Sequence, residues 1–152
     1  MNKICFVASS GGHLEEISRL IKIENAYPNF LITETNNYNT ENFGKKKYFV
    51  PQMNRKEILF SLKFALLFIR AIMILSKEKP DYIITTGALI SYPFGIVGKL
   101  RGCKLIYIES FARVNNASLT GKLLYKYADL FIVQWEDMLK VYPKAVLGGG
   151  IF

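Results

Sequence analysis

Short apolar runs alternate with helical stretches along the whole chain, and this alternation constrains the fold more than any other feature of the sequence. The runs are apolar along their length, which is typical of strands buried on both faces in a parallel sheet. The sequence therefore predicts an α/β fold, doubly wound around a mostly parallel sheet, with residues 1–152 forming a single domain. We expect strands at 4–8, 30–33, 48–50, 82–86, 104–109 and 130–134, and helices at about 14–25, 55–77, 93–100 and 136–142.

Composition excludes several other classes of protein. The chain has 152 residues, a length that fits one domain and is small for a complete two-domain enzyme. Of these residues 51% are hydrophobic and 21% charged, which is enough to form a hydrophobic core. Cys5 and Cys103 lie in apolar runs without paired spacing, which indicates buried thiols in a reducing compartment. The apolar run 4–8 is too short for a signal peptide. An Asn-rich segment, 34–44, is expected to be a mobile loop.

The turn after the first predicted strand is a candidate anion site. It reads Ser9-Ser10-Gly11-Gly12-His13. Glycines there let the backbone approach a ligand, and helix N-terminal amides favour an anion. His13 could donate to a phosphate or accept a proton. The alternative is a tight strand-to-helix turn in which a serine caps the helix and Glu15-Glu16 complement its dipole.

Glu109, at the end of the fifth predicted strand, has three possible roles. It could accept a sugar hydroxyl, act as a base, or pair with Arg113 to order the loop. Trp135 further on is either a stacking platform or core. His13 is the only histidine, and the sequence has no Asp-x-Asp or His/Cys cluster, so we expect no metal and no cofactor.

The predicted helix 55–77 is unusually apolar. Between residues 58 and 75 only Ser61, Lys63 and Arg70 are polar, over roughly 27 Å of helix. We do not expect a transmembrane span, because the strands on either side belong to one sheet. The heptad spacing puts four cations in a narrow arc. This indicates a surface that faces an anionic membrane or a partner subunit, the alternative being packing in the core. The cations are Lys56, Lys63, Arg70 and Lys77.

The net charge of +8 has no nucleic-acid motif beside it, so we expect no nucleic-acid partner.

Several motifs together resemble a known family. It is the membrane-anchoring subunit of the two-part UDP-N-acetylglucosamine transferase of the dolichol pathway, with its bacterial relatives in capsule and exopolysaccharide synthesis, described as accessory subunits of β-1,4-galactosyl- or glucosyltransferases. The turn alone also resembles that of the peptidoglycan N-acetylglucosaminyltransferase. The motifs are Ser10-Gly11-Gly12-His13-Leu14-Glu15, Lys79-Pro80-Asp81, Thr86-Gly87, Glu109-Ser110-Phe111-Ala112-Arg113-Val114, Leu119-Thr120-Gly121-Lys122, Ala128-Asp129-Leu130-Phe131 and Val133-Gln134-Trp135.

The resemblance implies a Rossmann-like, acceptor-side N-terminal half of a GT-B glycosyltransferase split over two chains. A separate subunit would bind the nucleotide sugar and choose the donor, and the acceptor would be a sugar on a polyprenyl diphosphate. His13 or Glu109 would be the general base, and the diphosphate would lie against Ser9, Ser10, Gly11, Gly12, His13, Gly87 and Arg113.

We expect peripheral attachment at the cytoplasmic face of the plasma membrane. Dolichol-pathway members carry an N-terminal anchor, whereas here the first strand follows Met1 almost directly, so attachment would depend on residues 55–77 or on the acceptor. The alternatives are a recruitment module without catalytic residues and a self-sufficient small α/β enzyme, although a hydrolase's G-x-S-x-G elbow is absent.

Overall fold

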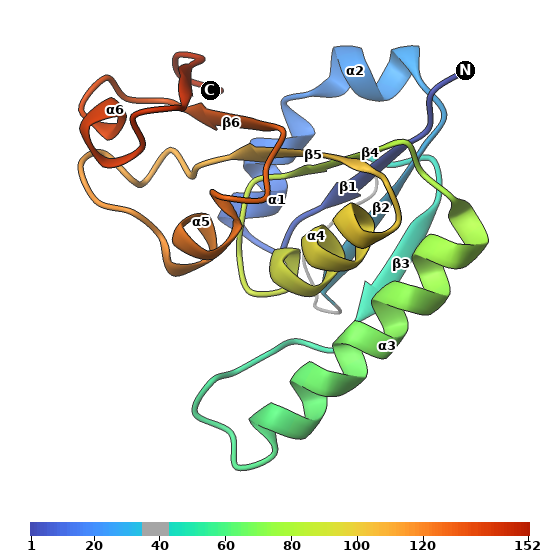
Figure 1. Cartoon of the computed structure of the whole chain (residues 1–152). Coiled ribbons are helices and arrows are strands. Elements are labelled where there is room, and N and C mark those ends of the chain that lie inside the picture. Colours follow the sequence, from blue (N-terminus) through green and yellow to red (C-terminus); the bar gives the residue numbers. More distant parts are fainter. Residues whose placement is uncertain (35–42) are drawn as a thin grey trace.

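A computed structural model describes residues 1–34 and 43–152, and it contains one sheet of parallel strands between two layers of helices (Figure 1). All six predicted strands are confirmed, and a short seventh strand that was not predicted, β7, completes the sheet. In sheet order they run β3-β2-β1-β4-β5-β6-β7. In chain order the elements are β1 Ile4–Val7, α1 Gly12–Ser18, α2 Ile21–Ala26, β2 Asn29–Glu34, β3 Lys47–Val50, α3 Phe60–Glu78, β4 Tyr82–Thr85, α4 Ser91–Leu100, β5 Lys104–Ile108, α5 Leu119–Leu124, β6 Leu130–Val133, α6 Met138–Val141 and β7 Val146–Leu147.

The strand order reverses at β1, which pairs with β2 on one side and with β4 on the other. Val7, the last residue of β1, is level with Ile32 in β2 and with Thr85 in β4. The turns that follow β1 and β4 therefore meet at one point beyond the carboxyl ends of these strands. This is the topological switch point at which doubly wound sheets bind their ligands.

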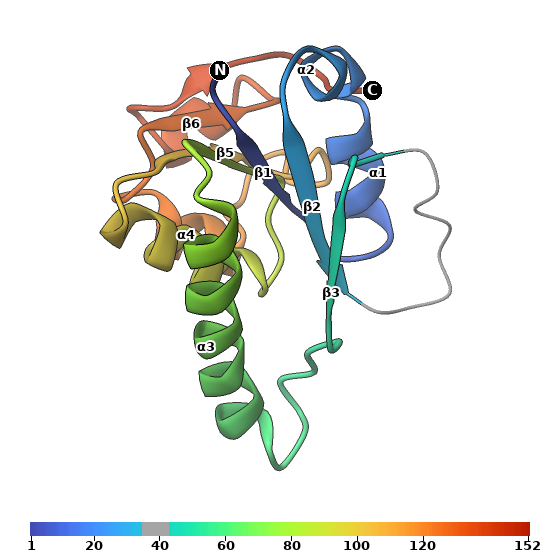
Figure 2. The same cartoon turned by 90° about the vertical axis from the view of Figure 1, so that its right-hand side faces the viewer.

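Side chains of β1 alternate between two apolar cores. Cys5 and Val7 face the core that α3 and α4 cover, and Ile4 and Phe6 face the core under α1. Figure 2 shows α1 and α2 on one side of the sheet and α3 and α4 on the other. Both cysteines are free and buried, as expected.

Two predicted helices differ from the structure. The helix predicted over 14–25 is interrupted at Arg19 and Leu20, whose amides bond the carbonyls of Glu16 and Ile17, three residues back, and tighten the end of α1. The helix predicted from about 55 begins at Phe60, because the side chain of Asn54 accepts a hydrogen bond from the Lys56 amide and closes a turn instead. Lys56 is therefore outside α3. Most of the loop expected to be mobile, residues 35–42, is outside the described residues.

Helix α3 has one buried and one exposed apolar side. Leu67, Ala71 and Leu75 are buried against the sheet. At 100° per residue, the opposite side carries apolar side chains that are about half exposed or more, namely Leu62, Leu66, Ile69 and Met73. The first turns of α3 project beyond the sheet on the side where β3 ends (Figures 1 and 2). No helix among the described residues is both long and apolar enough to cross a bilayer.

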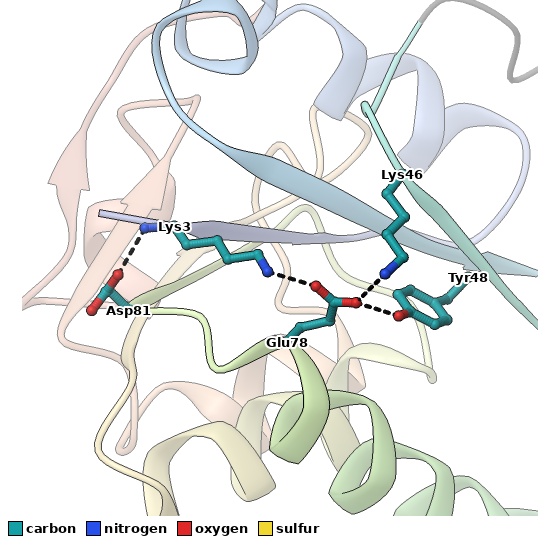
Figure 3. A network of polar contacts seen from close by, with 5 residues as sticks. All are labelled: Lys3, Lys46, Tyr48, Glu78 and Asp81. Carbon is teal, nitrogen blue, oxygen red and sulfur yellow. Dashed lines mark hydrogen bonds and ion pairs between the residues drawn. The ribbon is translucent and has the colours of Figure 1, made fainter. Parts of the chain in front are cut away.

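A buried carboxylate fixes the other end of α3. Glu78 accepts hydrogen bonds from Lys3 Nζ at 2.6 Å, from Lys46 Nζ at 2.5 Å and from the Tyr48 hydroxyl (Figure 3). Asp81, just after α3, accepts the backbone amide of Lys3 at 2.7 Å. These contacts join the end of α3 to β3 and to the start of β1.

Candidate functional site

The glycine turn begins α1 without a side-chain cap. Its N-cap is Gly11, at φ 84°, and not a serine as one reading expected. Ser9 is buried, and the Ser10 hydroxyl lies 3.5 Å from Glu34 Oε2, toward β2. An added Cβ would meet nothing within 4 Å at Gly11 or Gly12, so space above the turn is open to a ligand.

His13 is held to the turn after β4 by two reciprocal hydrogen bonds. Its Nδ1 lies 2.8 Å from the Thr86 carbonyl, and the Thr86 hydroxyl donates to the His13 carbonyl at 2.8 Å. A carbonyl oxygen can only accept, so Nδ1 carries the proton and the neutral ring has its free lone pair on Nε2. The contact therefore fixes the tautomer that a general base acting through Nε2 requires.

Gly87 lies directly against this ring. Its φ is 109°, and a Cβ added there would lie 2.9 Å from Tyr107 Oη and 3.3 Å from His13 Cε1. Ala88, the next residue, is also left-handed at φ 69°. Position 87 therefore requires glycine, because its backbone is left-handed and a Cβ would crowd Tyr107 and His13. The absence of a side chain lets the backbone of Gly87 pack against the His13 ring.

Glu109 is 1% exposed and both of its carboxylate oxygens are engaged. Oε1 accepts the Ser110 amide at 3.1 Å. Oε2 accepts the Ser118 amide at 3.2 Å, the Ser118 hydroxyl at 3.1 Å and the Tyr142 hydroxyl at 2.9 Å. Burial, and after it the negative charge of Glu109, raises the pKa of Tyr142 well above its ordinary value. The network ties the loop after β5 to α5 and to the end of α6.

Arg113 does not pair with Glu109, which corrects one expected reading of this loop. Its guanidinium donates to Asn116 Oδ1 at 3.0 Å. Trp135 Nε1 donates to the Phe111 carbonyl at 2.7 Å, and the Phe111 ring packs between Trp135 and Phe152. Trp135 therefore helps to hold the loop 109–114 in place.

Glu16 is a polar residue of the site that sequence reasoning missed. It is buried, and its Oε1 accepts the Ser110 hydroxyl at 3.0 Å and the Phe111 amide at 2.9 Å, while its Oε2 is buried without a described partner. Burial raises the pKa of Glu16, although the two hydrogen bonds act in the opposite direction. The sequence did contain a signal for Glu16: it follows His13 by three residues, so the two side chains lie on the same side of α1.

A pocket of about 300 Å³ opens beside His13. It brings together His13 and Arg113, which the sequence predicted, with Ser110, Ser118 and Thr120. Arg55, which was not predicted, also lines it. Ser9, Ser10, Gly11, Gly12, Gly87 and Glu109 are not among the lining residues.

The chemistry of this pocket suits an anion. Its charged lining residues are arginines, its hydroxyls can donate hydrogen bonds, and Ala88 and Leu89 lead into α4 at the helix N-terminus. Among residues 1–34 and 43–152, no group of three or more His, Cys, Asp or Glu side chains is arranged to hold a metal ion.

Lys56, Lys63, Arg70 and Lys77, the predicted membrane cations, are not among the residues that line this pocket. Arg70 donates to the Phe49 carbonyl at 3.5 Å, Lys63 pairs with Glu57, and Lys77 is exposed in the last turn of α3. At 100° per residue these three cations of α3 border its exposed apolar side.

Solved structures with this fold include larger proteins. MurG from Acinetobacter baumannii matches 90% of this chain with a TM-score of 0.70 at 16% identity, and UDP-N-acetylglucosamine 2-epimerase from Rickettsia bellii matches 94% with a TM-score of 0.72 at 18% identity. The chain spans 43% and 41% of these proteins. It thus has the Rossmann-like fold of a GT-B N-terminal half.

Sequence comparison gives a more specific relationship. The human UDP-N-acetylglucosamine transferase subunit ALG14 is 30% identical over 97% of this chain and 82% of its own length. The corresponding subunit of Kluyveromyces lactis is 60% identical over 42 residues, which cover 28% of this chain and 18% of that protein. The family model described as oligosaccharide biosynthesis protein Alg14-like matches residues 4–151. The chain therefore belongs to the Alg14-like family of oligosaccharide biosynthesis proteins.

Proposed function

We propose that this chain is the acceptor-side subunit of a two-chain glycosyltransferase that works in bacterial capsule or exopolysaccharide synthesis. It binds a sugar on a polyprenyl diphosphate at the cytoplasmic face of the membrane and completes a separate nucleotide-sugar-binding subunit. The observation that carries the proposal is the pocket in which His13, with its free Nε2, and Arg113 lie together at the switch point. The human relative's name, a transferase subunit, supports the two-chain arrangement.

In this proposal His13 is the general base. An inverting transfer needs one group that takes the proton from the attacking hydroxyl of the acceptor. His13 Nε2 suits this role, because Nδ1 is committed to the Thr86 carbonyl. Glu109 is instead a positioning residue, because Ser110, Ser118 and Tyr142 engage both of its oxygens.

The exposed apolar side of α3 is the proposed membrane contact. Leu62, Leu66, Ile69 and Met73 offer apolar side chains to the interfacial zone, and Arg70 and Lys77 at the edge of this side match anionic headgroups. Lys63 should contribute less than these two, because Glu57 offsets its charge.

His13→Ala in the reconstituted two-chain enzyme is the test of the catalytic role. Loss of one general base lowers turnover by about 100- to 10,000-fold. Lys140→Ala, on the exposed side of α6, is the control and should leave turnover unchanged. Unchanged turnover for His13→Ala would exclude His13 as the general base. Product formation by this chain without a partner would favour a self-sufficient enzyme and reject the split one.

Vesicle binding tests the membrane contact separately. The double variant Arg70→Gln with Lys77→Gln should bind vesicles containing phosphatidylglycerol about 10- to 30-fold more weakly, at about 1 kcal/mol for each cation near the surface. Lys140→Gln is the matched control. Wild-type binding that is absent, or that does not weaken with added salt, would exclude this contact.

A further inference from the structure

Arg55 lines the pocket beside His13, although it belongs to the segment that leads into α3. The same residue lines a neighbouring hollow of about 560 Å³ formed by residues 52–57. Arg55 therefore lies where the pocket meets the start of the proposed membrane helix. Its assignment below rests on the proposed function.

The charges around the pocket favour a ligand with more than one negative charge. Arg55 and Arg113 come from segments far apart in the sequence and line the same space, and no carboxylate is among the lining residues that the structure describes. Glu109 lies behind Ser118, but three hydrogen bonds from Ser118 and Tyr142 engage its Oε2. Guanidinium groups form bidentate hydrogen bonds with phosphate oxygens, so two of them suit a phosphate or diphosphate group.

Neither guanidinium is neutralised by a described acidic group. Arg113 bonds the neutral side chain of Asn116. Glu57, the acidic residue nearest to Arg55 in sequence, pairs with Lys63. Both arginines can thus bind an anion without first breaking an ion pair to an acidic group in residues 1–34 or 43–152.

The turn that carries Arg55 also carries apolar side chains toward solvent. The Asn54 side chain and the Glu57 amide, which bonds the Asn54 carbonyl at 3.2 Å, close this turn. Ile58 is fully exposed and Leu59 is 59% exposed. A cation three residues before an exposed isoleucine fits an acceptor whose phosphate is at headgroup level and whose prenyl chain remains in the membrane.

We propose that Arg55 is a phosphate-binding residue of the acceptor pocket and that, together with Arg113, it holds the diphosphate of the prenyl-linked acceptor. Arg113 approaches from the loop after β5 and Arg55 from the turn that precedes α3. The pocket thereby selects acceptors that carry a diphosphate over sugars that lack one.

The test compares Arg55→Gln and Arg113→Gln in the complete two-chain enzyme. With a short-chain prenyl-diphosphate sugar as acceptor, each variant should raise the acceptor KM about 10- to 100-fold, the range for a hydrogen bond to a charged group. Arg55→Lys should recover part of this loss, because it keeps the charge without the planar fork. Arg101→Gln, at the far end of α4 from the pocket, is the control and should match the wild type.

Three outcomes would overturn the inference or its basis. An Arg55→Gln enzyme with unchanged acceptor KM, beside an Arg113→Gln enzyme with a raised one, would overturn the phosphate-binding role of Arg55 and leave the proposed function intact. Wild-type enzyme that uses the same sugar without a diphosphate equally well would overturn the proposed acceptor itself. If Arg55→Gln raised the KM of the nucleotide sugar and not that of the acceptor, the site would belong to the donor. Thermal unfolding of each variant checks that the exposed Arg55 has no role in folding.

Discussion

Glu78→Gln should destabilise the domain in a way that depends on pH. Burial by itself raises the pKa of Glu78, but hydrogen bonds from Lys3, Lys46 and Tyr48 outweigh it and lower the pKa to about 2. The charged carboxylate is therefore more stable in the folded chain than in the unfolded one.

The size of the effect follows from this shift. A fall in the pKa from 4.5 to about 2 corresponds to about 3 kcal/mol. The side chains of Lys3 and Lys46 are 32% and 51% exposed, so water screens part of this interaction. We expect Glu78→Gln to lower the free energy of unfolding by about 2 kcal/mol at neutral pH, or the Tm by about 4–8 °C.

The sign of the pH dependence is fixed by the direction of the shift. Because the pKa is lower in the folded state, the stabilisation is fully present above the unfolded value of 4.5 and is lost as the pH falls toward about 2. The wild type and Glu78→Gln should therefore differ most at neutral pH and converge as the solution is acidified through this window.

Urea unfolding at a series of pH values measures this difference directly. Asp137→Asn removes an acid from an exposed pair on the surface of α6 and should leave the urea midpoint unchanged. A Glu78→Gln difference that is equally large at pH 7 and near pH 2 would refute the electrostatic explanation, and so would a neutral-pH difference no larger than that of Asp137→Asn.

Three further substitutions test other parts of the structure by thermal or urea unfolding. Gly87→Ala should destabilise the domain by about 1–3 kcal/mol more than Gly102→Ala, because both positions have positive φ but only at Gly87 does the new Cβ have neighbours within 4 Å. Equal losses of stability in the two variants would exclude a clash with His13 and Tyr107. Tyr142→Phe removes one donor to Glu109 Oε2 and should lower the free energy of unfolding by about 1–3 kcal/mol. Tyr127→Phe, at an exposed tyrosine, is the control and should leave it unchanged. No difference between the two variants would mean that the Tyr142 hydrogen bond adds no stability. Leu75→Ala should cost about 2–5 kcal/mol and Leu62→Ala almost nothing, and the reverse order would show that the sides of α3 are wrongly assigned.

Local patterns were enough to predict the sheet. The strands β1, β2 and β4–β6 are apolar runs bounded by turn residues. A few adjacent residues are therefore enough to predict each of them. The break between α1 and α2 was missed, because it depends on backbone hydrogen bonds to carbonyls three residues back at the end of α1. The late start of α3 was missed, because it depends on a hydrogen bond to the side chain of Asn54. Neither kind of hydrogen bond changes the apolar periodicity of the sequence.

The site was predicted in part for a related reason. His13 could be found because it follows a strand whose carboxyl end lies at the switch point of the sheet, whereas Arg113 was predicted as a ligand contact through the family resemblance. Glu16 contacts Ser110, 94 positions away, and Arg55 reaches the pocket from a turn whose path depends on the placement of α3. Glu109 and Arg113 are close in sequence, yet nearby donors on α5 and α6 engage Glu109 instead.

The contact between His13 and Thr86 also has a consequence for how the domain folds. Both of its hydrogen bonds join residues 73 positions apart, with β2, β3 and α3 between them. Closing so long a loop is entropically costly until β1 and β4 have paired. A nascent chain that ends before β4 could therefore form the glycine turn but could not orient the histidine ring. The proposed base would acquire its working tautomer only late in folding, once the central strands are in register.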